Sequence, residues 1–281
     1  MSLVWLITGT SSGFGSEFVK QALSRGDKVI ATARSVRNIS HLKDLGAEVL
    51  QLDVTSPQSE LNAKAAEAIA IFGRVDVLVN NAAFTQFGFL EDMSEDDYVE
   101  QFNTNVFGTI NTTRSFLPYF RNRKSGTIVN IGSMSAWETY PGVGAYSASK
   151  AALRYVTDAL DQEVSSIGIR VLLVEPGQFR TELLSAQNSI FAESRTPEYQ
   201  DVAQVTFQTF RDVHGKQRGD PVKGVARIID VVRSDNGAAG MGWPKELALG
   251  PDAVAVIRKK CEETLRMLVE WEEFSSGTDV V

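Results

Sequence analysis

Tyr146 and Lys150 stand four residues apart in the segment AYSASKAAL, among small side chains. On a helix, residues at this spacing share a face, with Cβ atoms roughly 5–6 Å apart. A free phenol has a pKa of about 10, and a neighbouring ammonium group stabilises the phenolate and lowers that pKa. The pair could therefore serve in acid–base catalysis at neutral pH. The alternative is a half-exposed tyrosine stacked over a surface lysine.

Two serines follow the short apolar run in VNIGSMSAW and are candidates to hold a substrate oxygen. They are Ser133 and Ser135. A hydroxyl group beside a reacting oxygen can stabilise the charge that develops there.

Gly9, Gly13 and Gly15 lie between an apolar run and a helical pattern in ITGTSSGFGSEFVKQAL. Glycine permits a tight turn and close approach of a ligand to the backbone. The amino terminus of the following helix favours an anion such as a pyrophosphate. In the first βα unit of the chain this arrangement predicts a dinucleotide site. The alternative is an ordinary strand-to-helix turn, and the spacing is GxxxGxG, not the commoner GxGxxG.

Short apolar, β-branched runs alternate with longer helical patterns along the chain, which is typical of βαβ units and a parallel sheet. The hydrophobicity of the runs is nearly continuous, which indicates that helices cover both faces of the sheet. We expect Pro118 to kink or divide the third helix. The expected strands are 3–8, 28–33, 47–53, 75–80, 126–132, 169–176 and 244–250, and the expected helices lie near 16–25, 57–72, 95–123 and 147–166.

Residues 178–219 interrupt this alternation, with scattered aromatic residues and no strand pattern. Long excursions in a compact domain are usually functional, so we expect a substrate-binding lid here. A new helix should begin with Asp220 as its N-cap and Pro221 at its first position. Residues 251–274 have the pattern of an amphipathic carboxy-terminal helix. Without a linker or repeat, residues 1–281 are expected to form a single domain.

Composition narrows the classes of function. The chain has 281 residues, is 43% hydrophobic and carries a formal net charge of -7, which argues against a nucleic-acid partner. The single cysteine, Cys261, excludes an intrachain disulfide and is expected to be buried in a late helix. The two histidines lack metal-ligand spacing, so no metal is expected. The apolar run LVWLITG is too short to span a bilayer and has no basic leader, which favours a cytoplasmic protein without a membrane partner.

TGxxxGxG near the amino terminus, followed far downstream by YxxxK, resembles the short-chain dehydrogenase/reductase family in its single-domain branch. The resemblance covers nearly the whole chain. It implies an α/β, single-domain, doubly wound Rossmann fold with a mostly parallel sheet of about seven strands. Family spacing places the catalytic serine thirteen residues before the tyrosine, which selects Ser133, with Ser135 as runner-up. Asn105 matches an asparagine that relatives use to seat a water beside the lysine; the alternative is a polar helix residue bonded to backbone.

The resemblance also implies which residues hold a dinucleotide. Thr181 would bond the nicotinamide carboxamide, and Asp53 and Val54 would contact the adenine, although Asp53 could instead form a turn after its strand. Ala83 and Gly132 depart from the family pattern, which has glycine and serine there. The full set is Gly9, Ser11, Ser12, Gly13, Phe14, Gly15, Arg34, Asp53, Val54, Asn81, Ala82, Ala83, Tyr146, Lys150, Pro176, Gly177 and Thr181.

The second strand ends with Ala33, at the place where the family's NAD-selective acid would sit, and Arg34 follows directly. No carboxylate would repel a 2′-phosphate, and a guanidinium group offers forked, charge-assisted hydrogen bonds to one. The sequence therefore predicts NADP(H) as cofactor and makes NAD(H) the less favoured choice.

These motifs together predict reversible, NADP(H)-dependent reduction of a ketone or aldehyde. A cleft lined by Phe84, Phe87, Phe89, Trp137 and Tyr140 would favour a hydrophobic carbonyl substrate. A regulator that senses the dinucleotide without turnover is the alternative, although such proteins typically lose the tyrosine or the lysine. Epimerases of the extended branch carry TGxxGxxG and a larger carboxy-terminal domain. Relatives usually pair through the helices near 95–123 and 147–166, so a homodimer or homotetramer is expected.

Overall fold

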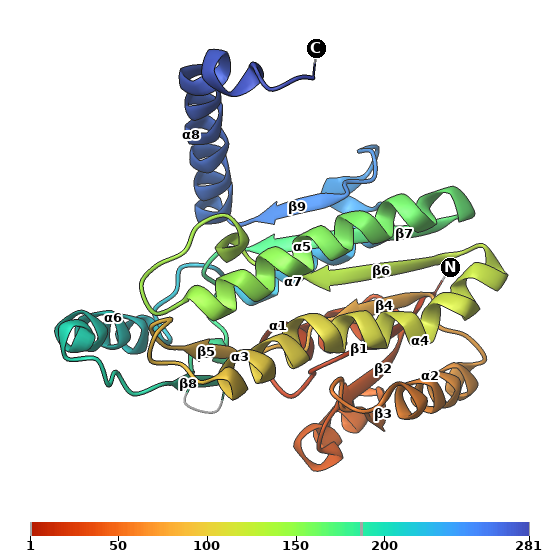
Figure 1. Cartoon of the computed structure of the whole chain (residues 1–281). Coiled ribbons are helices and arrows are strands. Elements are labelled where there is room, and N and C mark those ends of the chain that lie inside the picture. The colour runs from red at the N-terminus through yellow and green to blue at the C-terminus, as the bar shows by residue number, and fades with distance from the viewer. Residues whose placement is uncertain (1, 186–187, 281) are drawn as a thin grey trace.

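A seven-stranded parallel sheet forms the centre of the computed structural model, which describes residues 2–185 and 188–280 (Figure 1). Its order is β3-β2-β1-β4-β6-β7-β9, with every neighbouring pair parallel. This order confirms the doubly wound fold. The strands are β1 (Val4–Ile7), β2 (Lys28–Ala33), β3 (Glu48–Gln51), β4 (Val77–Asn80), β6 (Gly126–Ile131), β7 (Ile169–Pro176) and β9 (Glu246–Leu249), within a residue or two of the expected runs.

Helices cover both faces of the sheet, because successive side chains of each strand point to opposite sides. Trp5 and Ile7 pack in one apolar cluster beneath α1 (Gly13–Ser24) and α7 (Pro221–Arg233). Val4 and Leu6 pack in the other, beneath α2 (Gln58–Phe72), α4 (Gly108–Arg123) and α5 (Gly144–Val164). As expected, the Asp220 carboxylate caps α7 by accepting from the Val222 N–H at 2.9 Å, with Pro221 at the first helical position.

The helical stretch expected at 95–123 is divided, but not at Pro118. It consists of α3 (Glu95–Phe102), a π-helical turn at Asn103–Phe107 and α4, which continues through Pro118. A π-helical turn inserts an extra residue into the helix and often marks a functional site.

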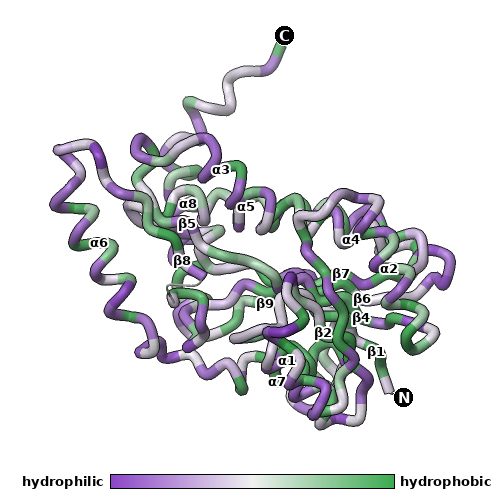
Figure 2. The backbone as a smooth tube through the Cα atoms, turned by 90° about the horizontal axis from the view of Figure 1, so that it is seen from below, coloured by the Kyte–Doolittle hydropathy of each residue, from purple (hydrophilic) through white to green (hydrophobic). Residues whose placement is uncertain are grey.

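The segment 178–219 is more regular than its sequence suggests, although residues 186–187 lie outside the described residues, as do Met1 and Val281 of the expected domain. It contains β8 (Ser189–Phe191), which pairs in parallel with β5 (Thr85–Phe87), and α6 (Gln200–Val213). Both strands have three residues, too few to show a period of two. The Phe87 and Phe191 rings stack 4.6 Å apart across the pair. Figure 2 shows α6 apart from the main sheet, beyond β5 and β8.

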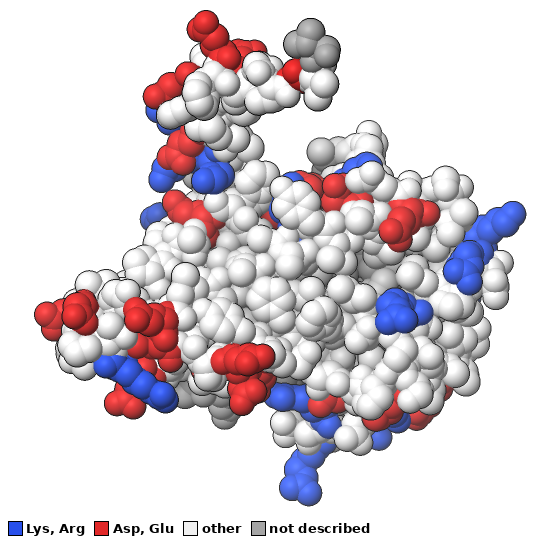
Figure 3. Space-filling model, viewed as in Figure 1, with Lys and Arg blue, Asp and Glu red and all other residues white. Residues whose placement is uncertain are grey.

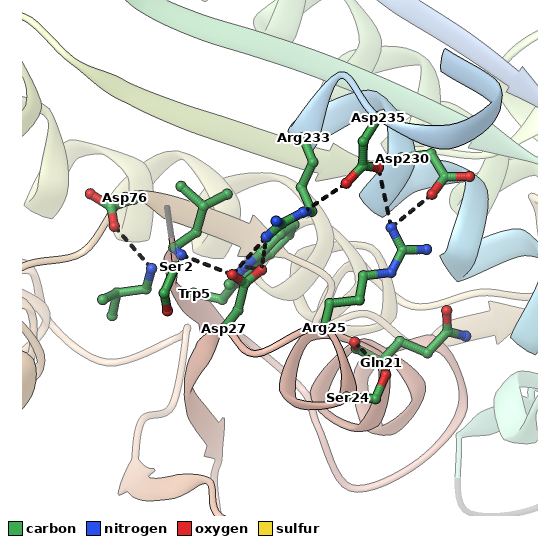
Figure 4. A network of polar contacts seen from close by, with 12 residues as sticks. Ser2, Trp5, Gln21, Ser24, Arg25, Asp27, Asp76, Asp230, Arg233 and Asp235 are labelled. Atoms are coloured by element: carbon green, nitrogen blue, oxygen red, sulfur yellow. Dashed lines mark hydrogen bonds and ion pairs between the residues drawn. The ribbon is translucent and has the colours of Figure 1, made fainter. Parts of the chain in front are cut away.

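A network of ion pairs joins α7 to the amino-terminal end of the sheet (Figure 4). The Arg233 guanidinium donates to both carboxylate oxygens of Asp27, each at 2.7 Å, and Trp5 Nε1 donates to one of them at 2.9 Å. The Asp27 side chain has no exposed surface. These contacts hold α7 against β1 and the start of β2.

The last helix, α8 (Pro251–Ser276), stands away from the rest of the molecule (Figure 1). Ala253 is its one buried residue, and Cys261 is exposed. The prediction of a buried Cys261 was therefore wrong, because the helix is buried or half-buried only up to Ile257 and is exposed from Arg258 onward. In the part of the chain that the structure describes, no helix is both long and apolar enough to span a lipid bilayer.

Candidate active site

A cleft of about 390 Å³ lies at the carboxyl ends of the strands, where the order of the sheet reverses between β1 and β4. Ligands of open α/β sheets bind at such switch points. Every residue predicted for the site lines this cleft, together with Ser135, apart from Gly15 and Asn105.

The glycine loop makes a cradle that larger residues would fill. Gly9 has a φ of +68°, and a Cβ atom placed there would lie 2.8 Å from the Ala82 Cα. A Cβ atom on Gly15 would collide with the Gly9 carbonyl oxygen, so Gly15 acts beneath the turn and not on its surface. Gly13, at a φ of +54°, faces Thr181. The open backbone at the start of α1 fits a pyrophosphate.

Hydrogen bonds fix the adjoining wall of the cleft. Thr8 Oγ1 accepts from the backbone N–H groups of Asn81 at 2.9 Å and Ala82 at 3.0 Å. Asn81 Nδ2 donates to the carbonyl oxygens of Thr8 at 2.9 Å and Gly9 at 3.0 Å. The loops after β1 and β4 are thus one unit, and the methyl group of Ala83 is accommodated at the cleft surface.

Residues after β2 and β3 line the far end of the cleft. Arg34 is exposed there, directly after the buried Ala33. Asp53 Oδ1 accepts from Thr55 N at 2.9 Å and from Thr55 Oγ1 at 2.7 Å. Asp53 therefore forms a turn after its strand, which was the structural alternative in the sequence analysis. Asp53 also lines the cleft.

Ser133, Tyr146 and Lys150 meet at the near end of the cleft and are 8%, 7% and 3% exposed. The Ser133 hydroxyl is hydrogen-bonded to the Tyr146 phenol. It also accepts from the Ser135 N–H at 3.0 Å. Lys150 Nζ donates to the Ile131 carbonyl at 2.8 Å and lies 5.7 Å from the centre of the Tyr146 ring. The alternative of a surface tyrosine and lysine is excluded by this burial.

Burial governs the ionisation of this pair. It raises the pKa of Tyr146, and the hydrogen bond with Ser133 opposes the rise. It also lowers the pKa of Lys150 to about 8. The expectation that Lys150 lowers the pKa of the phenol is not met, because loss of hydration disfavours charge on both groups. Lys150 nevertheless remains mainly protonated at neutral pH.

Asn105 lies in the π-helical turn and is 1% exposed. Its Nδ2 donates to the Phe84 carbonyl and to Ser149 Oγ, both at 3.1 Å, and its Oδ1 accepts from Phe84 N at 3.2 Å. The side chain therefore bonds to backbone, as in the structural alternative, and fixes Phe84 beside the first turn of α5.

Sequence reasoning missed the group that anchors the segment after Ser133. Trp137, expected in the cleft, instead donates through Nε1 to both carboxylate oxygens of Glu175, at 2.9 and 3.0 Å. The Arg154 guanidinium lies 4.2 Å from the Trp137 ring and bonds Glu175 Oε2 at 3.0 Å. Glu175 is 1% exposed, and burial raises its pKa. The sequence feature that could have indicated this cluster is the carboxylate Glu175 within the apolar run IRVLLVEP.

Aromatic and aliphatic side chains surround the near end of the cleft. Phe84, Phe87 and Tyr140 line it as expected, whereas Phe89 stacks with Tyr199 at 5.2 Å outside it. Among the described residues that line the cleft, Arg34 and Lys150 are the only cations. The other apolar lining residues at this end are Met134, Val143, Leu183, Leu184, Ile190 and Phe210.

Residues 3–190 match the family described as short chain dehydrogenase. The chain belongs to the short-chain dehydrogenase/reductase family. It is therefore an oxidoreductase that depends on a nicotinamide dinucleotide, as predicted. Solved structures with this fold hold NAD in some cases and NADP in others.

Relatives match over most of this chain. Oxidoreductase BOA17 of Botryotinia fuckeliana is 32% identical, with 98% of each chain covered. A 3-ketodihydrosphingosine reductase of Bacteroides thetaiotaomicron is 35% identical over 82% of this chain and 84% of its own length. A solved structure of a short-chain dehydrogenase from Streptomyces avermitilis is 40% identical, has a TM-score of 0.88 and covers 99% of this chain and 98% of its own.

Proposed function

We propose that this chain is an NADP(H)-dependent oxidoreductase that reversibly reduces a hydrophobic ketone or aldehyde to an alcohol. The observation that carries the proposal is the burial of Ser133, Tyr146 and Lys150 together at one end of the cleft, with Arg34 at the other. NADPH, when bound, supplies the hydride.

The three buried residues would divide the remaining work. The Ser133 hydroxyl donates to the substrate oxygen and holds it beside the phenol. Tyr146 gives its proton to that oxygen during reduction and accepts it back during alcohol oxidation. Lys150 would bond the nicotinamide ribose through its amine. Exclusion of water by the apolar walls strengthens each of these interactions.

The rest of the cleft would bind the cofactor. The loop from Gly9 to Gly15 takes the pyrophosphate at the start of α1. Thr181, hydrogen-bonded through Oγ1 to Leu183 N at 3.4 Å, faces the loop and is proposed to bond the carboxamide. Asp53 and Val54 are proposed to contact the adenine, and Ser11, Ser12 and Arg34 are proposed to contact the 2′-phosphate.

Replacing Arg34 with Asp should shift the cofactor preference toward NADH. Loss of charge-assisted hydrogen bonds, about 1.5–3 kcal/mol, corresponds to a roughly 10- to 100-fold lower kcat/KM for NADPH. Arg37→Asp makes the same charge change at an exposed residue outside the cleft and should alter the preference little. Steady-state kinetics with both cofactors measure this. A wild-type chain that uses NADH at least as efficiently as NADPH would contradict the assignment.

The apolar lining supports a hydrophobic substrate, because no second cation stands near Lys150 among the lining residues to bind an acid. One relative is named a 3-ketodihydrosphingosine reductase, and a ketone is what the proposed site would reduce. The segment 178–219, which supplies Leu183, Leu184, Ile190 and Phe210 to the cleft, is proposed as its lid.

A panel of aliphatic and aromatic ketones with NADPH, followed at the nicotinamide absorbance, tests the proposed activity. We expect turnover to rise with the apolar surface of the ketone. NADPH binding without turnover across the panel would instead favour the sensing regulator.

A cytoplasmic location and a homodimer or homotetramer are also proposed. The face formed by α4 and α5 carries few charges (Figure 3) and exposes Tyr155 and Phe107, at 72% and 51%. Pairing through this face would cover them.

A further inference from the structure

Helix α8 presents an apolar row that the described part of the chain covers only partly, at its base. The helix has 26 residues, and every described residue from Arg258 to Val280 is exposed. Val254, Ile257, Cys261, Leu265 and Leu268 recur at intervals of three or four residues and so share one face. Leu265 and Leu268 are 62% and 54% exposed. A helix in water gains most of its stability from packing such a face, so this row requires a covering surface.

The charges of α8 are unevenly distributed along its length. A run of three cations, Arg258, Lys259 and Lys260, lies nearer its base, and a group of three carboxylates, Glu270, Glu272 and Glu273, lies nearer its free end, with Glu262, Glu263 and Arg266 between them. Two such helices laid antiparallel would place the basic segment of each against the acidic segment of the other. Arg258 lies beside the row between Ile257 and Cys261, and Glu272 follows its last member, Leu268. In an antiparallel pair centred on Leu265, each would meet the other.

A groove beside the base of α8 can receive a second helix. It is lined by Ala248 of β9 and by Val254, Ile257, Arg258, Cys261, Glu262 and Leu265 of α8. An antiparallel partner would bring its Leu268–Glu272 segment into this groove, beside Ile257 and Arg258. The acidic surplus of α8, with six carboxylates and four cations in Pro251–Ser276, disfavours an anionic lipid surface as the occupant.

We propose that α8 pairs antiparallel with α8 of a second copy of this chain, centred near Leu265. The pairing covers the apolar row and joins Arg258 of each copy to Glu272 of the other. This interface is separate from the α4 and α5 face.

Disulfide crosslinking of the full chain tests the orientation, because Cys261 is the only native cysteine. In the antiparallel pair the two Cys261 residues lie about 12 Å apart along the axis, beyond disulfide range, whereas Cys261 is within one residue of level with Leu268 of the partner. Leu268→Cys should give a covalent dimer under mild oxidation. Met267→Cys, one residue away and about 100° around the helix from Leu268, should not, and neither should the wild type.

Charge reversal tests the pairing itself by sedimentation velocity. Arg258→Glu and Glu272→Arg should each weaken the assembly step at least about tenfold, as expected for like charges facing one another. The double variant R258E/E272R should restore it. Two substitutions on an exposed surface elsewhere control for the change in net charge: Lys43→Glu makes the same change as Arg258→Glu, and Asp44→Lys the same change as Glu272→Arg.

Three results would overturn the proposal. The first is that the single variants Arg258→Glu and Glu272→Arg assemble like the wild type. The second is that the wild type forms a covalent dimer through Cys261, which would indicate parallel helices. The third is binding of the wild type to phosphatidylserine vesicles with no α8-dependent assembly, which assigns the face to a lipid surface.

Discussion

At the scale of single residues, the site contains polar groups whose charged forms are disfavoured by burial. Tyr146 and Lys150 lose most of their contact with water, and each keeps a polar neighbour, Ser133 for the phenol and the Ile131 carbonyl for the ammonium. A neutral carbonyl oxygen compensates an ammonium group only in part. Lys150 is therefore a group whose proton is held less tightly in the folded chain than in the unfolded one.

This burial predicts a pH dependence of stability. Lys150 has a pKa of about 8 in the folded chain. Its pKa is about 10.4 when unfolded, so between these values the unfolded chain binds a proton that the folded chain does not, and stability rises with pH. Lys150 should therefore add about 2–4 kcal/mol to the free energy of unfolding across this pH range.

Lys150→Met should remove this rise. Urea denaturation of wild type and variant at several pH values from 8 to 10.5 measures the difference between their free energies of unfolding. That difference should grow with pH in favour of the wild type. Two curves that stay parallel across the range would contradict a desolvated Lys150.

At the scale of elements, the positions of the proposed catalytic side chains depend on how the helices are bonded to the sheet. Helix α5 carries Tyr146 and Lys150, and one turn later Arg154 binds Glu175 of β7. The same Glu175 holds Trp137, so the segment after Ser133 is anchored to the strand and the helix together. On the other face, the pair of Arg233 with Asp27 ties α7 to the strands beside the glycine loop.

Arg233→Ala should destabilise the chain. It leaves the buried Asp27 carboxylate with the N–H groups of Leu3 and Trp5 but without its cation. Removing one partner of a buried ion pair lowers the free energy of unfolding by about 3–5 kcal/mol. Because Arg233 is partly exposed, we expect a loss of about 2–4 kcal/mol here. Lys64→Ala, which breaks the exposed pair with Glu67, should cost less than about 0.5 kcal/mol. The urea midpoints of the two variants measure these losses of stability. If Arg233→Ala lost no more stability than Lys64→Ala, the pair of Arg233 with Asp27 would contribute nothing to the stability of the fold.

At the scale of the whole molecule, one cleft runs along the carboxyl edge of the sheet from Arg34 to the buried tyrosine. The main strands and the glycine loop could be predicted from sequence, because hydrophobic period and glycine spacing are local signals. The short strands β5 and β8 could not, since three residues carry no period. Nor could the Trp137, Glu175 and Arg154 cluster, whose members meet only in the fold, or the exposure of Cys261, which depends on where α8 points.

The most direct test of the account is the turnover of Tyr146→Phe with NADPH and a hydrophobic ketone. Loss of the phenolic proton should lower kcat by about 10²–10⁴-fold. The Kd for NADPH, measured by fluorescence titration, should stay within about threefold, because the ring remains. Tyr140→Phe, at another tyrosine that lines the cleft, should keep kcat near the wild-type value. A Tyr146→Phe enzyme with wild-type kcat would contradict the proton role assigned to Tyr146 and the proposed mechanism with it.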